Sequence, residues 1–396
     1  MPTTSIQNGD TLLLNSSKSV LIRQLVLEAL YGDHLSQPHA DDSEDVWVVF
    51  HALNIIKQNI NKSLQNIDNT FITIDVKDCG AGYRFLMAVA AVTPGKWLLT
   101  GTKRLLERPI APLVEALKSA GADIERCDTG WQISGKELHA QRLRIDCSQS
   151  SQMASALLLV GERIGLQELD LSPTPPPSAP YIEMTRQMVE AHRQGKRIQR
   201  EADWSTAAFW YAFLAASTDI DTLILKDLQL NTLQGDAVTA EWFRDFGIRS
   251  ESTCEGVRIH KESGTSSSPL VYDLTHHPDL APVMAAAALL GRRTVTLTGL
   301  GNLNRKESRR MDLLCELLSH FCTLQRQGDE KLTIDGTSFI TNSKPITFNP
   351  QNDHRMVMAA VLLSLHFPVQ LTDTDSVKKS YPQFQKYFIS DLKNQK

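Results

Sequence analysis

The chain alternates two kinds of expected helix, and this alternation limits its possible folds more than any other feature of the sequence. Six segments open with polar or charged residues and continue as runs rich in Ala, Leu, Val and Met, which predicts helices buried on all sides. These segments are residues 18–31, 79–92, 150–161, 204–217, 279–291 and 353–365. Self-similarity of this kind is typical of folds built from repeated units.

A second expected helix, apolar on one face only, follows each buried one after roughly 25–30 residues. The amphipathic segments are residues 43–56, 110–124, 182–192, 236–248, 307–321 and 384–393. Short β-branched runs, typical of strands, lie between the helices at residues 70–76, 143–145, 222–225, 257–260, 294–297 and 331–334. We therefore expect a mixed α/β chain of six similar units, most simply grouped as three per domain.

A length of 396 residues also predicts two or more domains. The Pro-rich stretch at residues 172–180 has the composition of a linker. It is equally compatible with a rigid loop inside one domain, and the sequence leaves both interpretations open.

Charge and cysteine usage exclude several classes of partner. The net charge of −4 argues against nucleic acid, which selects basic surfaces. Residues 1–10 have no signal-peptide pattern and the apolar run 280–290 is too short to span a bilayer, so we expect a cytoplasmic protein with no membrane partner. The six Cys form no CxxC pair and the eleven His form no HExxH pattern, so no metal is expected.

Charged residues stand where the buried helices begin. Lys18 opens the first of these helices, Arg355 stands at the start of the last, and Asp279 opens the fifth. A cation there opposes the helix dipole at a cost of roughly a few tenths of a kcal/mol, unless an anion binds the exposed N–H groups. Ser150 and Ser151 open the third helix, where they are either simple N-caps or ligand contacts.

Further cations lie at other junctions between loops and helices. They are Arg104, Arg108, Lys306, Arg310 and Lys379. Arg suits bidentate binding of carboxylate or phosphate, and Lys acts as a point charge or a proton donor. Their shared placement predicts an enzyme that binds small phosphate- and carboxylate-bearing substrates.

Eight short motifs occur in a fixed order between about residues 15 and 388. They are Lys18-Ser19 with Arg23, Glu107-Arg108-Pro109-Ile110, Ser150-Ser151-Gln152, Ser178-Ala179-Pro180-Tyr181-Ile182, His277-Pro278-Asp279, Lys306-Glu307-Ser308-Arg309-Arg310, Asn352-Asp353-His354-Arg355-Met356 and Lys379-Ser380-Tyr381-Pro382. Each is weak alone, but together they resemble the motif series of the 5-enolpyruvylshikimate-3-phosphate (EPSP) synthase family, the 3-phosphoshikimate 1-carboxyvinyltransferases.

The resemblance implies the fold. It is a two-domain inside-out α/β barrel of the enolpyruvyl transferase type, with six βαβαββ-like repeats, three in each domain. Residues 1–17 and 202–396 would form one discontinuous domain, and residues 18–201 would form a domain inserted into it. The active site would lie in the cleft between the two domains.

The resemblance also implies the reaction. The 5-hydroxyl of 3-phosphoshikimate adds to C2 of phosphoenolpyruvate, and the tetrahedral intermediate then loses phosphate. Protons must move at the hydroxyl and at C3, which requires acid–base groups among phosphate-binding cations. By motif position, Asp279 takes the hydroxyl proton, and Lys18 and Glu307 serve the other transfers. No cofactor is implied, and the chain is expected to act as a monomer.

Two overlapping sets of substrate-binding residues follow from the same motifs. The residues expected to bind 3-phosphoshikimate are Lys18, Ser19, Arg23, Ser150, Ser151, Gln152, Ser178, Tyr181, Asp279, Asn302 and Lys306. The residues expected to bind phosphoenolpyruvate are Lys18, Gly80, Arg108, Gln152, Arg310, His354, Arg355 and Lys379.

The chain departs from the family pattern at several positions. Asp78 and Ala81 stand where the family has Asn and Thr, and Phe85 stands where Pro is common after Arg84. An apolar pair replaces the usual polar pair before Arg23, and Arg309 replaces an acid. We expect these changes to alter ligand affinity more than fold.

Two alternative functions remain. The sister enolpyruvyl transferase that acts on UDP-N-acetylglucosamine usually has Asn after its first lysine and often a Cys before its Arg-Pro pair. Here Ser19 follows Lys18, and residues 101–108 contain no Cys. The other alternative is a non-catalytic ligand-binding relative, which Asp78 and Ala81 suggest.

Overall fold

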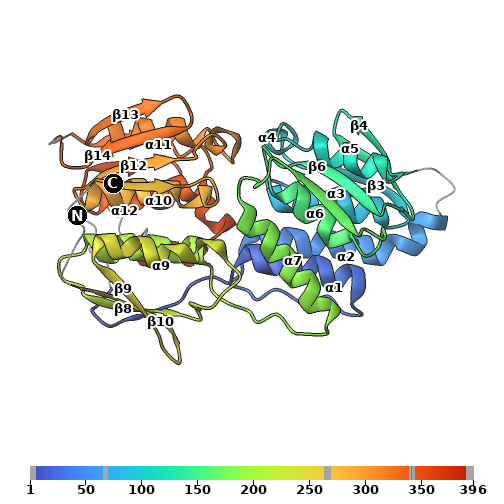
Figure 1. Cartoon of the computed structure of the whole chain (residues 1–396), viewed down its shortest axis with the longest axis horizontal. Helices are drawn as coiled ribbons and strands as arrows, with labels where there is room; N and C mark the ends of the chain where they lie inside the picture. The colour runs from blue at the N-terminus through green and yellow to red at the C-terminus, as the bar shows by residue number, and fades with distance from the viewer. Residues whose placement is uncertain (1–5, 66–69, 263–268, 339, 341–343, 389–396) are drawn as a thin grey trace. The chain divides into compact units, whose positions relative to one another are not determined.

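The computed structural model describes residues 6–65, 70–262, 269–338, 340 and 344–388, without the side chains of residues 60–65. The chain divides into two compact units (Figure 1). Unit 1 comprises Met1–Ser17 and Glu201–Lys396, and unit 2 comprises Lys18–Arg200. The Pro-rich stretch at residues 172–180 lies inside unit 2 as a loop between a strand and a helix.

Unit 2 contains three successive α/β segments. The first holds α1 (Lys18–Tyr31) and α2 (Glu44–Gln65). The second holds β2 (Ile72–Asp75), α3 (Gly80–Val92), β3 (Gly95–Thr100), α4 (Lys103–Leu106), α5 (Ala111–Ser119), β4 (Asp123–Cys127) and β5 (Gly130–Gly135). The third holds β6 (Arg142–Asp146), α6 (Gln152–Val160), β7 (Glu168–Ser172) and α7 (Ala179–Arg193).

Unit 1 also contains three segments. The first holds β1 (Thr11–Leu12), α8 (Trp204–Ala216), β8 (Thr222–Lys226), η1 (Gly235–Val238), α9 (Thr239–Trp242), η2 (Phe243–Phe246), β9 (Ile248–Ser252) and β10 (Gly256–Lys261). The second holds β11 (Leu270–Asp273), η3 (Pro278–Leu280), α10 (Ala281–Leu290), β12 (Thr294–Thr298), η4 (Leu303–Arg305), α11 (Arg310–Ser319), β13 (Thr323–Gln327) and β14 (Lys331–Asp335). The third holds β15 (Ile346–Phe348), α12 (His354–Ser364), β16 (Val369–Leu371), η5 (Asp375–Lys379) and α13 (Phe384–Phe388).

Three sheets share one topology, which makes the repeat visible in the backbone. Their strand orders are β2-β3-β5-β4, β1-β8-β10-β9 and β11-β12-β14-β13. In each sheet the first two strands are parallel, and the last two form an antiparallel hairpin. A buried helix, α3 or α10, joins the parallel pair in two of these sheets, whereas all of unit 2 and α8 lie between β1 and β8 in the chain. The pairs β6-β7 and β15-β16 keep only the parallel part of this unit. Residues 18–65 hold two helices and no strand.

The six buried helices form the centres of the two units. In unit 2, α1, α3 and α6 contact one another, and in unit 1, α8, α10 and α12 do the same. Every residue of α8 from Trp204 to Leu214 is buried, as expected of a helix that is apolar all round. Helix α10 also packs against β12 and β14 of the outer sheet of unit 1 (Figure 1). The helices thus lie inside and the sheets outside.

Most expected helices and strands are present, with shifts at their ends. Residues 236–248 form a run of 3₁₀ and α turns instead of one helix, and Gly247, at φ 76°, ends that run. The helix expected over residues 110–124 ends at Ser119, and Ile124 belongs to β4. Helix α11 begins at Arg310, so Glu307 precedes it. Of the expected helix 384–393, residues 384–388 are helical and the rest lies outside the described residues.

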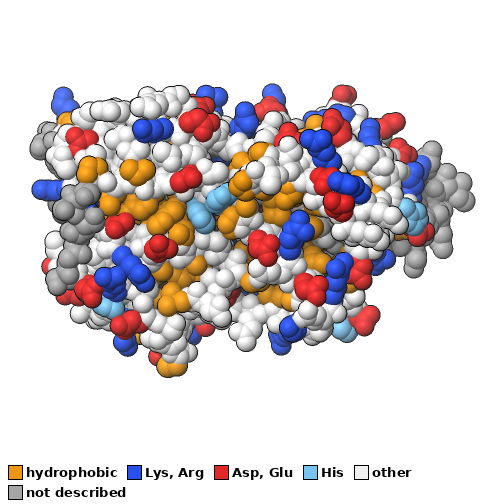
Figure 2. Space-filling view, viewed as in Figure 1, with side chains coloured by type: hydrophobic (Ala, Val, Ile, Leu, Met, Phe, Trp, Pro, Cys, Tyr) orange, Lys and Arg blue, Asp and Glu red, His pale blue; other side chains and the backbone are white. Residues whose placement is uncertain are grey.

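Charges of both signs are interspersed on the molecular face shown in Figure 2, where Lys and Arg stand beside Asp and Glu. This distribution fits the small net charge of −4. Among the described residues, no helix is both long and apolar enough to cross a membrane.

Candidate active site

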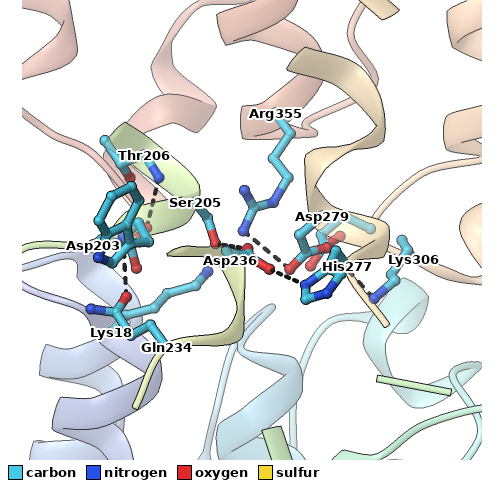
Figure 3. A network of polar contacts seen from close by, with 12 residues as sticks. Lys18, Asp203, Ser205, Thr206, Gln234, Asp236, His277, Asp279, Lys306 and Arg355 are labelled. Atoms are coloured by element: carbon cyan, nitrogen blue, oxygen red, sulfur yellow. Dashed lines mark hydrogen bonds and ion pairs between the residues drawn. The ribbon is translucent and has the colours of Figure 1, made fainter. Parts of the chain in front are cut away.

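Asp279 lies in η3, directly before α10, and forms ion pairs with three cations of unit 1. Its Oδ1 is 3.1 Å from Arg310 Nη1 and 3.6 Å from Lys306 Nζ, and its Oδ2 is 3.1 Å from Arg355 Nη2. Figure 3 shows Arg355 and Lys306 converging on this carboxylate. Burial by itself would raise the pKa of Asp279, but Arg355, Lys306 and Arg310 together bring it well below its usual range. Asp279 is therefore ionised at neutral pH.

Arg310 is fully buried and binds three carboxylates. Its Nε and Nη2 donate to the two oxygens of Asp353 at 3.0 and 3.3 Å, and its Nη2 also donates to Glu307 Oε2 at 2.6 Å. Its remaining contact is the bond to Asp279. Burial would lower the pKa of Arg310, but Asp353, Glu307 and Asp279 raise it above its ordinary value. Arg310 thus fixes Asp279 and Glu307 near each other.

Asp353 explains why this arrangement forms at the start of α12. It is the N-cap of that helix and accepts the backbone N–H groups of Arg355 and Met356 at 3.0 and 3.4 Å. The same carboxylate accepts the hydroxyl of Ser308 at 2.8 Å and the guanidinium of Arg310. An N-cap aspartate both satisfies orphan N–H groups and favours the helix dipole. Capping therefore orients Arg355 toward Asp279.

The remaining expected residues of unit 1 stand at the starts or ends of neighbouring helices. His354 is the buried first residue of α12, and Asn302 is the residue before η4. Lys379 ends η5, and its Nζ donates to the backbone carbonyl of Asn352 at 3.3 Å. The last bond brings Lys379 next to the loop that precedes α12.

A second polar chain lies beside Asp279 (Figure 3). Ser205 Oγ donates to Asp236 Oδ2 at 2.5 Å, and Asp236 Oδ1 is 3.5 Å from His277 Nδ1. The ring of Trp242 packs edge-on against His277 with 5.5 Å between centroids. Asp236 is buried, and His277 is two residues from Asp279. The chain links the starts of α8, η1 and η3.

In unit 2, Lys18 and Asp45 form an ion pair between the first turns of α1 and α2. Lys18 Nζ is 3.0 Å from Asp45 Oδ2, and both side chains are more than four-fifths buried. The pair explains why a lysine is tolerated as the first residue of α1. It also leaves an ammonium group at a helix start with a nearby carboxylate, which is a possible proton-transfer pair.

Gly80 and Arg108 are in direct contact at the start of α3. A β-carbon at position 80 would lie 2.4 Å from Nη1 of Arg108 and 2.9 Å from its Cζ. Only glycine therefore allows the guanidinium to lie against the backbone here. Because a helix start offers free N–H groups, Arg108 and α3 together make a site suited to an anion.

Gln152 is linked to the same region by Arg84. Nη1 of Arg84 donates to Gln152 Oε1 at 2.9 Å and to the Gly80 carbonyl at 3.0 Å. Gln152 is the first residue of α6, and its N–H donates to Ser150 Oγ at 3.3 Å. Ser150 therefore has a capping contact, whereas the side chain of Ser151, at the N-cap position, makes no capping bond.

Arg23, Ser178 and Tyr181 meet through the backbone at the start of α7. Ser178 precedes this helix in a left-handed conformation, at φ 57°. The Tyr181 carbonyl accepts Arg23 Nη2 at 3.2 Å, and the Ser19 carbonyl accepts Arg23 Nη1 at 2.7 Å. Arg23 is 2 % exposed, and each of its three guanidinium nitrogens donates to a protein oxygen.

Within each unit, the expected residues therefore gather at helix starts. Unit 1 combines two carboxylates with three cations, an arrangement that can move protons beside a bound anion. Unit 2 combines Lys18, Arg108 and helix N-termini, an arrangement suited to phosphate or carboxylate. No group of three or more His, Cys, Asp or Glu that could bind a metal ion occurs among the described residues.

Comparison with known families decides the classification. The sequence model of the EPSP synthase family (3-phosphoshikimate 1-carboxyvinyltransferase) matches residues 7–200 and 189–388. The chain belongs to the EPSP synthase family.

Similar proteins from bacteria and archaea carry the same name. The chain is 32 % identical to the 3-phosphoshikimate 1-carboxyvinyltransferase of Bacteroides fragilis over 94 % of this chain and 93 % of that protein. It is 31 % identical to the enzyme of that name from Thermococcus kodakarensis over 78 % of each chain. The solved EPSP synthase of Acinetobacter baumannii shares the fold with a TM-score of 0.68 at 18 % identity, covering 98 % of this chain and 97 % of that one.

These matches confirm the family expected from the ordered motifs and, with it, the enolpyruvyl transferase fold and the transferase class of enzyme. They support the EPSP synthase interpretation over the UDP-N-acetylglucosamine transferase and over a non-catalytic relative.

The structure gives the unusual residue Asp78 a partner. The hydroxyl of Thr102 donates to Asp78 Oδ1, and Thr102 is also the N-cap of α4. Arg84, six residues further along the chain, binds Gln152 and two backbone carbonyls. The extra carboxylate thus joins a neighbouring loop. At another departure, Arg309 pairs with Asp312 at 2.6 Å.

Three acids beside the expected site residues were not predicted from the sequence. Asp45, Asp236 and Asp353 contact expected residues or their neighbours. Asp353 lies in one of the eight ordered motifs, at the start of an expected buried helix. A signal existed for each, because each acid lies in or directly before the first turn of a helix or 3₁₀ turn.

Proposed function

We propose that this chain transfers the enolpyruvyl group from phosphoenolpyruvate to the 5-hydroxyl of 3-phosphoshikimate and releases phosphate. One observation carries the proposal beyond family membership. Asp279 and Glu307 are both bound to Arg310, and Asp279 also contacts Lys306 and Arg355. Two carboxylates among three cations supply both acid–base groups and anion binding.

In the addition step, the 5-hydroxyl oxygen bonds to C2 of phosphoenolpyruvate while C3 gains a proton. Asp279 accepts the hydroxyl proton, and Lys18 or Glu307 supplies the proton to C3. In the elimination step, C3 returns a proton, the double bond re-forms and the C2–O bond to phosphate breaks. The atoms balance without an added oxidant or reductant.

The shared cations link substrate binding to the basicity of Asp279. A substrate phosphate or carboxylate that binds Arg355 or Lys306 would bring negative charge close to Asp279, because both cations also contact Asp279. The attraction that lowers the pKa of Asp279 then weakens, and its pKa rises. Bound substrate thus makes Asp279 a stronger base.

The proposed binding roles follow the motif assignments. We assign Ser19, Ser150, Ser151, Ser178, Tyr181, Asn302 and Lys306 to 3-phosphoshikimate, together with Lys18, Arg23, Gln152 and Asp279. We assign Gly80, Arg108, His354, Arg355 and Lys379 to phosphoenolpyruvate, together with Lys18, Gln152 and Arg310. Arg310 is buried and bonded to three carboxylates. We therefore propose that its main role is to orient Asp279 and Glu307.

A phosphate-release assay with purified protein tests the proposal. We expect release only when 3-phosphoshikimate and phosphoenolpyruvate are both present, with the enol ether product identified by mass. No release with both substrates at saturation would contradict the proposal. Release with UDP-N-acetylglucosamine in place of 3-phosphoshikimate would favour the sister enzyme.

A further inference from the structure

The ring of Phe85 on α3 lies against the guanidinium of a buried arginine in unit 2. The guanidinium carbon of Arg23 is 5.2 Å from the centroid of the Phe85 ring, and Arg84 is the preceding residue on the same helix. Arg23, Arg84 and Phe85 are 2 %, 1 % and 0 % exposed. Two guanidinium groups in such a core require compensating contacts.

Arg23 finds those contacts on α1, α6 and α7. Its Nε donates to Thr185 Oγ1 at 2.7 Å, and its Nη2 donates to Ser155 Oγ at 3.3 Å. Bonds to the carbonyls of Ser19 and Tyr181 complete the set. All four acceptors are neutral, and burial lowers the pKa of Arg23 to about 10. The positive charge of Arg23 is therefore bound by dipoles and by the face of one aromatic ring.

Arg84, the residue before Phe85, bonds to residues at or before the starts of three helices. It bonds the Gly80 carbonyl at the start of α3, Gln152 at the start of α6 and the Pro109 carbonyl before α5. Together the two arginines join the first turns of α1, α3, α6 and α7. These are the helix starts that carry Lys18, Ser19, Gly80, Gln152 and Tyr181.

We infer that Phe85 is a positioning residue for 3-phosphoshikimate binding: the face of its ring fixes the Arg23 guanidinium, which orients the starts of α1, α6 and α7 without Phe85 touching the substrate. This inference rests on the proposed function. Simple core packing would need only an apolar side chain of similar volume. A ring over a guanidinium adds an electrostatic attraction that an aliphatic side chain cannot supply.

Fluorinated phenylalanines at position 85 separate these two roles, because fluorine withdraws electron density from the ring face while changing its volume little. We would incorporate 4-fluoro-, 3,5-difluoro- and pentafluorophenylalanine and measure KM for each substrate, kcat and Tm. We expect KM for 3-phosphoshikimate to rise stepwise, by about three- to tenfold for the pentafluoro form, since cation–π attraction at desolvated sites is of that order. KM for phosphoenolpyruvate and kcat should change by less than about twofold. Arg23 bonds the backbones of Ser19 and Tyr181, which are assigned to 3-phosphoshikimate alone. The side chains of Lys18 and Gln152, which also serve phosphoenolpyruvate, are held by Asp45 and Arg84 instead.

Pentafluorophenylalanine at Phe209 is the control. That ring is buried in α8, and it contacts no cation among the described residues. In this variant, KM for 3-phosphoshikimate should match the wild-type value. A flat KM across the Phe85 series, or a parallel change in both KM values, kcat and Tm, would overturn the inference. Wild-type protein without transferase activity would instead overturn the proposed function.

Discussion

Asp279 and Arg355, which are 76 residues apart in the chain, are joined by a 3.1 Å bond between Oδ2 and Nη2. The bond connects η3 to the first turn of α12, and Asp353 caps that turn. The group assigned to take the hydroxyl proton is therefore bound to a group assigned to phosphoenolpyruvate. Acid–base chemistry and anion binding share one set of contacts.

Replacing Asp279 by Asn should abolish turnover while leaving 3-phosphoshikimate binding largely intact. The amide keeps the shape but cannot accept a proton, so we expect kcat to fall by about 100-fold or more. Steady-state kinetics and calorimetric titration with 3-phosphoshikimate measure the two effects. Asp312→Asn on α11, where the acid pairs with Arg309 and Arg326, is the matched control and should retain wild-type turnover. Near-normal turnover of Asp279→Asn would show that another group accepts the proton.

The ion pairs of Asp279 should also appear in the pH dependence of stability. The pKa of Asp279 is lowered in the folded protein, below an unfolded value of about 3.9. Its contribution to the free energy of unfolding is therefore fully present above about pH 4 and is lost as the pH falls toward the folded-state pKa. Urea unfolding of wild type and Asp279→Asn should show a difference that is constant near neutral pH and shrinks in acid. A difference that grows on acidification would contradict this account.

Local pattern predicted the buried helices better than the contacts among them. Helix α1 has the expected bounds, Lys18–Tyr31, because its apolar run is long and has clear ends. Asp353 and Arg310 are 43 residues apart, and their bond depends on how α11 and α12 pack, which no local pattern specifies. Residues 236–248 were expected as one helix because their apolar spacing fits one. The binding of Asp236 to Ser205 and the left-handed Gly247 limit that run to short turns.

Asp353 should be the most important carboxylate for the stability of unit 1. It is fully buried, pairs with Arg310 and caps α12. Removing one partner of a buried ion pair typically costs about 3–5 kcal/mol. We expect a loss toward the lower end of that range, because Arg310 keeps its bonds to Glu307 and Asp279. Asp353→Asn keeps a capping oxygen, whereas Asp353→Ala loses it and should cost about 1 kcal/mol more. Chemical denaturation measures both. Equal stability of the two variants would mean that the cap contributes little.

The cysteines should differ sharply in reactivity. Burial raises the pKa of the Cys79 thiol far above its usual range and raises that of Cys147 and Cys322 to about 11. Cys254 is exposed. Because the thiolate is the reactive form, iodoacetamide near neutral pH should label Cys254 in the native protein and spare the three buried thiols. Peptide mass spectrometry reads out the sites, and denatured protein, with all six labelled, is the control. Native labelling of Cys79 would show that the start of α3 opens.

The contact between Gly80 and Arg108 predicts a selective loss of phosphoenolpyruvate binding in Gly80→Ala. The new β-carbon would lie 2.4 Å from Nη1 of Arg108, so the guanidinium must move away from the start of α3. Loss of one charge-assisted contact is worth about 1.5–3 kcal/mol, so we expect KM for phosphoenolpyruvate to rise by about tenfold or more.

Gly82→Ala, two residues further along α3, is the control for that prediction. Its β-carbon would meet Val49 and Cys79 at 3.0 and 3.1 Å, and none of its three nearest atoms belongs to Arg108. It should therefore lower Tm without a selective change in KM for phosphoenolpyruvate. A similar rise in that KM for both variants would mean that disturbance of the helix start, and not displacement of Arg108, causes the loss.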